Sequence, residues 1–154
     1  MSAGAAFAVN EFSLEFGKKV SENLRCIVNA NLDMNGVISG KYDYPGISFD
    51  FIGQFVFASK KYGNGEVITG YAGPGVTVGY VRGNDGLYGL MAGVCGEIGM
   101  EYAFNVPVSL SLFLAPVLGV TVCRPEDSIN FRMGLYEYGL IASLMPRIGI
   151  KYRF

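Results

Sequence analysis

Apolar residues alternate with small or polar residues along most of this chain, with a period of two residues. In one stretch, for example, Phe49, Phe51 and Phe55 alternate with Asp50 and Gln54. A period of two is typical of a β-strand, because successive side chains of a strand point to opposite faces. The pattern predicts strands near residues 2–9, 11–19, 23–34, 46–59, 66–82, 86–105, 107–122 and 141–154.

Turn-forming residues separate the predicted strands. Asn35-Gly36 and Gly63-Asn64-Gly65 are examples, and residues 123–140 form the longest irregular stretch, which we interpret as a long loop or an extended hairpin. Short turns between consecutive strands favour an antiparallel meander, and eight strands are enough to close a barrel. We therefore expect a single all-β domain over residues 1–154, an eight-stranded antiparallel up-and-down β-barrel.

The two faces of the predicted strands differ in chemistry. One face carries large apolar residues such as Phe49, Leu110 and Ile148, and the other carries small, polar or charged residues. The large residues would overfill the lumen of an eight-stranded barrel, whereas the small and polar residues fit there. We therefore predict a transmembrane barrel whose apolar face meets lipid. A soluble lipocalin-like carrier, with the apolar face inside, is the alternative.

Charged residues of both signs lie on the polar face. Inside a narrow lumen they are expected to form a paired network, because an unpaired buried charge is costly. Arg25 and Asp50 are one candidate pair. The predicted lumen network comprises Glu15, Arg25, Asp50, Glu97, Glu101, Arg147 and Lys151.

Aromatic residues near the strand ends are candidates for the girdles that flank the lipid-facing band of such barrels. They are Tyr80, Tyr88, Tyr102, Phe104, Tyr152 and Phe154.

Composition narrows the class of protein further. Charged residues make up 16% and hydrophobic residues 51% of the chain, and the net charge is −1, which argues against a disordered or nucleic-acid-binding protein. No apolar run reaches the roughly 18 residues of a transmembrane helix. Met1 to Gly4 lacks the pattern of a signal peptide, so we interpret Met1 as a start placed ahead of a mature sequence. Three cysteines form no CxxC motif, and we expect Cys26 and Cys95 to serve packing.

Candidate chemistry is sparse. The chain has no histidine, which excludes Ser/His/Asp hydrolysis, Cys/His proteolysis and zinc sites with histidine ligands. Glu97 and Glu101 share one face of a strand but lie about 13 Å apart, too far for a glycosidase pair. The glycine-rich segment 70–75 contains Pro74, and no helix is predicted after it, so we interpret it as a kinked strand rather than a phosphate-binding loop. We expect no enzymatic activity, no cofactor and no metal.

The end of the chain, Arg147 to Phe154, resembles the last strand of bacterial outer-membrane β-barrels, which the barrel assembly machinery reads. The segment 96–112, followed by Ala115-Pro116, resembles a family of small outer-membrane-protein-like barrels of OmpA/OmpX-type size. At Phe113 and Ala115 that family usually carries an acidic residue and an arginine, so a charge-based function does not carry over. The resemblance implies an assembly signal made of Ile148, Ile150, Tyr152 and Phe154.

The resemblance further implies a location in the outer membrane of a Gram-negative bacterium, with outer-membrane lipid and the barrel assembly machinery as partners. We expect a monomer without nucleic-acid partners or a wide pore. Its function would be that of a structural or interaction scaffold presenting the loops 34–46, 82–86 and 123–140 outside the cell. A barrel that binds or transports a small hydrophobic molecule is the alternative.

Overall fold

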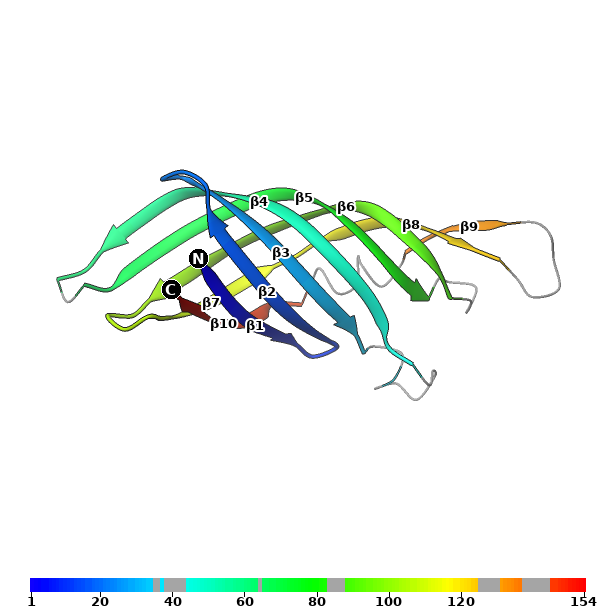
Figure 1. The fold of residues 1–154 in the computed structure, drawn as a ribbon, viewed down its shortest axis with the longest axis horizontal. Helices are drawn as coiled ribbons and strands as arrows, with labels where there is room; N and C mark the ends of the chain where they lie inside the picture. The colour runs from blue at the N-terminus through cyan, green and yellow to red at the C-terminus, as the bar shows by residue number, and fades with distance from the viewer. Residues whose placement is uncertain (35–36, 38–43, 64, 83–87, 125–130, 137–144) are drawn as a thin grey trace.

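The structure is a computed structural model, and it describes residues 1–34, 37, 44–63, 65–82, 88–124, 131–136 and 145–154. The described strands form one antiparallel sheet of ten strands (Figure 1). They are β1 (Ser2–Ala8), β2 (Glu11–Lys19), β3 (Leu24–Asp33), β4 (Gly46–Lys61), β5 (Val67–Arg82), β6 (Tyr88–Ala103), β7 (Val108–Leu114), β8 (Val117–Cys123), β9 (Arg132–Leu135) and β10 (Arg147–Arg153).

The predicted strands are confirmed at most positions, and the differences have local causes. The predicted strand 107–122 divides into β7 and β8 at Ala115-Pro116, since proline has no backbone N–H to donate to a ladder. Both halves pair with β6 in one continuous register, and the Pro116 carbonyl accepts a hydrogen bond from the Gly96 N–H at 2.9 Å.

The C-terminal third differs most from the prediction. The predicted strand 141–154 is present as β10 from Arg147 to Arg153, and residues 137–144 lie outside the described part of the chain. β9 pairs antiparallel with β8, so the described part of segment 123–140 is an extended hairpin rather than a loop.

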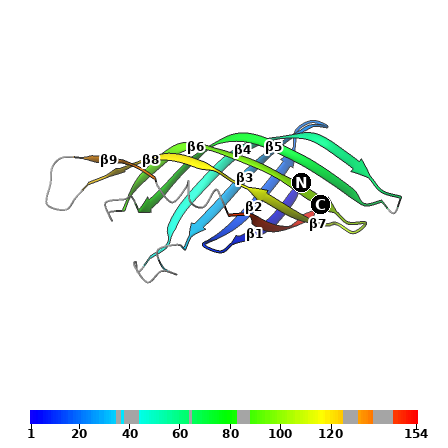
Figure 2. The ribbon, with the colours of Figure 1, turned by 180° about the vertical axis from the view of Figure 1, so that it is seen from behind.

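Every consecutive pair of strands from β1 to β7 is antiparallel, and β10 pairs with both β1 and β7. The first and last strands are therefore neighbours, and the Met1 amine donates a hydrogen bond to the Phe154 carbonyl at 2.9 Å. Both chain ends lie together at one end of the molecule, here called the terminal end, and the β8–β9 hairpin extends at the other (Figures 1 and 2).

The sheet is strongly curved. Arg25 on β3 forms an ion pair with Glu101 on β6, although β4 and β5 separate these two strands in the sheet. Contacts of this kind place the polar face on the inside of the curve and the apolar face on the outside. Among the described residues, fifteen buried side chains are polar or charged and thirteen are apolar, so polar groups make up much of the interior.

The glycine-rich segment 70–75 belongs to β5, as the kinked-strand interpretation predicts. A side chain at Gly73 would lie 2.1 Å from the Gly53 carbonyl oxygen, so only glycine permits this close approach of β5 to β4. Nearby, the register between β4 and β5 shifts between Val56 and Ala58.

The expectation that Cys26 and Cys95 serve packing holds for Cys95 but not for Cys26. Cys95 is buried, but Cys26 is exposed because it lies on the outer parity of β3. No helix among the described residues is long and apolar enough to cross a membrane.

Candidate functional site

The buried polar side chains on the inner side of the sheet are the candidate site, which we call the polar interior. Strand alternation positions them, because every second residue of an inner-facing strand points inward. The polar interior comprises Ser13, Glu15, Asn29, Asn31, Asp50, Gln54, Thr69, Thr77, Glu97, Glu101, Ser109, Ser111, Thr121, Arg147 and Lys151.

Two ion pairs lie toward the terminal end of the polar interior. The Arg25 Nη1 atom lies 2.6 Å from Glu101 Oε2, and the Lys151 Nζ atom lies 2.6 Å from Glu15 Oε1. The second pair is almost fully buried, with 4% of the Lys151 side chain and 3% of the Glu15 side chain exposed. At such burial each charge depends on its partner, because neither has water to solvate it.

Further buried side chains fill the interior, and two of them, Tyr71 and Phe113, lie beside Lys151. Tyr71 is fully buried, and the Lys151 Nζ atom lies 5.5 Å from the centroid of its ring and 6.0 Å from that of Phe113. Both distances fit cation–π contacts. Gln54, also fully buried, donates a hydrogen bond from Nε2 to Glu97 Oε1 at 2.9 Å.

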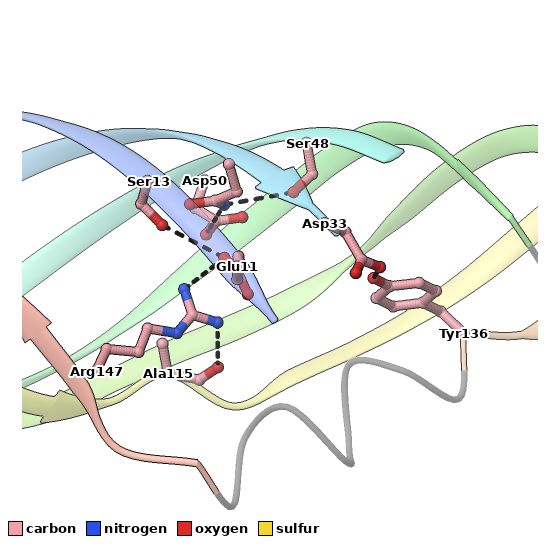
Figure 3. A network of polar contacts seen from close by, with 9 residues as sticks. Glu11, Ser13, Asp33, Ser48, Asp50, Ala115, Tyr136 and Arg147 are labelled. Carbon is pink, nitrogen blue, oxygen red and sulfur yellow. Dashed lines mark hydrogen bonds and ion pairs between the residues drawn. The ribbon is translucent and has the colours of Figure 1, made fainter. Parts of the chain in front are cut away.

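A second polar network surrounds Arg147 (Figure 3). Its guanidinium extends from β10 toward Glu11 on β2, with 2.7 Å between Nη1 and Oε1, and Nη2 donates to the Ala115 carbonyl at 3.5 Å. The Ser13 hydroxyl donates to the same Glu11 oxygen at 3.4 Å. Arg147 therefore ties β10 both to β2 and to the Ala115-Pro116 interruption between β7 and β8.

Three further hydrogen bonds near this network involve residues of β3 and β4 (Figure 3). The Asn31 amide donates to Asp50 Oδ2 at 2.7 Å and to the Ser48 hydroxyl at 3.3 Å. The Tyr136 hydroxyl donates to Asp33 Oδ2 at 2.7 Å.

The structure buries six of the seven residues of the predicted lumen network, namely Glu15, Asp50, Glu97, Glu101, Arg147 and Lys151. The seventh, Arg25, is half-buried.

The predicted pairing of Arg25 with Asp50 is wrong. The β3–β4 register places Arg25 opposite Gln54 and Asn29 opposite Asp50, so four residues of strand separate the two charges. Arg25 reaches across the interior to Glu101 instead, and Asp50 accepts a hydrogen bond from Asn31.

Sequence reasoning missed the partner of Arg147. Glu11 is the first residue of the predicted strand 11–19 and has the same parity as Ser13 and Glu15, which is a usable signal, but the predicted lumen network does not include it. Tyr136 was missed because it falls in the stretch predicted to be irregular.

Glu97 and Glu101, which are four residues apart on β6, are bound by different side chains. Glu97 accepts from Gln54, whereas Glu101 is bound to Arg25, so each has a separate partner. Within the described ranges, no group of three or more acidic or cysteine side chains is arranged to hold a metal ion.

The residues of the predicted assembly signal lie on the outer face of the last strand or just beyond it. Their side chains are all about half exposed or more, and they are Ile148, Ile150, Tyr152 and Phe154. Their role in assembly stays a prediction.

Comparison with protein-family models, with curated proteins and with solved structures finds no match for this chain.

Proposed function

We propose that this chain is a bacterial outer-membrane protein, a closed eight-stranded transmembrane β-barrel that serves as a non-enzymatic scaffold for external loops. The observation that carries the proposal is the burial pattern. Phe57 and Leu90 on the outer face are 67% and 70% exposed, whereas Gln54 and Glu97 on the inner face are 0% and 2% exposed. In water, a sheet that buries charge and exposes large apolar residues over its whole outer face is unfavourable. In lipid the same arrangement is favourable.

The strand pairings support a closed barrel. Strands β1 to β7 and β10 each have a neighbour on both sides, since β5 pairs with β6 as well as with β4. Residues that are paired from strand to strand form a row that can be followed once around these strands. The row starts at Leu112 on β7 and returns at Val122 on β8, ten residues further along the chain. The row is Leu112, Ile148, Phe7, Phe12, Leu32, Ile47, Tyr80, Leu90 and Val122.

This stagger gives the tilt of the proposed barrel. Ten residues over eight strands correspond to a tilt of about 40°, for a rise of about 3.3 Å per residue and a spacing of about 4.8 Å between strands. Membrane barrels have strand tilts of about 35–45°. The stagger is therefore of the size expected for a membrane barrel of eight strands.

The dimensions of the outer face support a lipid-facing band. On β6 the exposed apolar residues run from Leu90 to Met100, a length of about 25 Å along the axis of a barrel with this tilt. That length matches the apolar band of outer-membrane barrels.

Aromatic pairs lie beyond both ends of this band. The rings of Tyr80 and Tyr88 stack at 5.8 Å at the end away from the termini. At the terminal end, Tyr102 contacts Phe104 at 4.9 Å, and Tyr152 contacts Phe154 at 5.7 Å. These are the positions expected for two aromatic girdles.

The filled interior favours a scaffold over a pore. Tyr71, Gln54 and Phe113 are buried in the interior, and eight-stranded barrels leave an interior just wide enough for side chains. Outer-membrane lipid and the barrel assembly machinery are the proposed partners. If the terminal end faces the periplasm, as the resemblance implies, the loops beyond β3, β5 and β8 face outward.

A second candidate function rests on one observation. Seven buried side chains form a mainly apolar cluster inside the sheet, and a barrel that binds a small hydrophobic molecule would use such a surface. The cluster comprises Ile27, Ile52, Val81, Met91, Cys95, Val117 and Tyr136.

The test of the membrane proposal is refolding from denaturant with and without detergent micelles. We expect a β-type circular dichroism spectrum and a heat-modifiable shift on gel electrophoresis only when micelles are present. Monodisperse, folded protein in plain buffer would instead support the soluble carrier.

A further inference from the structure

A cavity of about 600 Å³ opens at the terminal end of the interior, apart from the packed middle. Its buried wall includes Glu15, Thr69, Glu101 and Lys151, and its rim includes exposed lysines. The volume falls within the range of small-ligand sites, which is about 300–1,000 Å³.

The lining of this cavity is strongly basic. Six of the twelve lysines and arginines of the chain line it, although the net charge of the whole chain is −1. These six are Lys18, Lys19, Arg25, Lys61, Lys151 and Arg153.

Two of these six charges are already neutralised, because Arg25 is paired with Glu101 and Lys151 with Glu15. Among the described residues, Glu22 is the one further acidic side chain that lines the cavity. The Arg153 Nη2 atom donates to the carbonyls of Phe104 and Val106 at 2.9 and 2.8 Å, and these neutral acceptors do not offset its positive charge. The cavity therefore carries an excess of three positive charges.

We propose that this cavity binds a phosphate-class oxyanion, either free phosphate or the phosphoryl group of a lipid headgroup. Lysine ammonium groups bind phosphate as mobile point charges, and the three-charge excess favours a multiply charged anion over a monovalent one. Low-dielectric walls concentrate the field of the charges that line them. The inference does not depend on the membrane assignment, because the same side chains enclose the cavity whatever solvates the outer face.

Two adjacent lysines of β4 provide a matched test. Both are exposed, but Lys61 lines the cavity, whereas the Nζ atom of Lys60 lies 5.5 Å from the centroid of the Tyr62 ring and Lys60 does not line the cavity. Lys61→Gln removes a charge from the cavity, and Lys60→Gln removes the same charge from the same strand at a position outside it.

The experiment is a calorimetric titration of inorganic phosphate into the folded protein in uncharged detergent micelles at low salt. Circular dichroism is recorded first for every variant, so that a folding failure is recognised as such. We expect Lys61→Gln to weaken phosphate binding by about threefold or more, and Lys60→Gln to change it far less. Equal weakening in both variants, or phosphate binding no tighter than acetate binding, would overturn the proposal.

A second arm separates the two sources of the anion. Dihexanoyl phosphatidic acid, a short-chain lipid with a phosphomonoester headgroup, is titrated below its micelle-forming concentration. Tighter binding than that of inorganic phosphate, with the same loss in Lys61→Gln, identifies a lipid headgroup as the ligand. Weaker binding with the same loss identifies free phosphate. Lipid binding that Lys61→Gln leaves unchanged would contradict the proposed site.

Discussion

The inner and outer faces of β6 are formed by alternate residues of one strand, and they are stabilised in different ways. Glu97 and Glu101 point inward and are bound by Gln54 and Arg25. Leu90, Val94 and Met100 point outward and are exposed. In lipid, the outer side chains gain little from burial against neighbours, because the acyl chains are as apolar as they are. Specific contacts are therefore concentrated inside, where each charge needs its partner.

The largest effect is expected at the most buried ion pair. Lys151→Met leaves Glu15 buried without a counter-charge and removes a cation from the ring of Tyr71. We expect the free energy of unfolding to fall by about 3–5 kcal/mol, measured by urea unfolding in lipid vesicles. The double variant that adds Glu15→Gln should recover part of this loss. A loss below about 1 kcal/mol for Lys151→Met would show that the interior does not depend on this pair.

A smaller difference should separate the two arginines of the interior. The Arg147 side chain is 4% exposed, whereas that of Arg25 is 28% exposed at the open cavity, where water screens it. We expect Arg147→Gln to cost about 3 kcal/mol and Arg25→Gln about 1 kcal/mol in the same unfolding assay. A larger cost for Arg25→Gln than for Arg147→Gln would contradict this ranking of the two ion pairs by burial.

A third comparison sets one inner residue against one outer residue. Glu97→Leu removes the acceptor of the buried Gln54 amide, and we expect a cost of about 1–3 kcal/mol. Leu112→Ala shortens a half-exposed outer side chain, and we expect a cost below about 1 kcal/mol, since lipid fills the space. If Leu112→Ala proved the more costly of the two, the assignment of the faces would be wrong.

The positions of the strands and the faces of their residues could be predicted from the sequence, because the parity of a residue within a strand fixes its side. The inward position of Glu97 and of Lys151 follows from this rule alone. The division of strand 107–122 was also within reach, since Pro116 lacks the N–H that a continuous ladder uses.

The pairing of charges could not be predicted in this way. Arg25 and Glu101 are 76 residues apart and meet only because the sheet curves, which depends on register and stagger at every pair of strands. Tyr136 reaches Asp33 from a segment without alternation, so no period indicated its side.

The central claim, that the outer face meets lipid, is tested most directly by placing one charge on it. Val94 lies near the middle of the exposed apolar run of β6, and Val106 is equally exposed in the turn between β6 and β7. In lipid vesicles we expect Val94→Arg to lower the free energy of unfolding by about 2–4 kcal/mol. Val106→Arg, the matched control, should lower it by no more than about 1 kcal/mol. Equal and small effects, below about 0.5 kcal/mol for both variants, would contradict the claim, because a water-facing surface accepts arginine at either position.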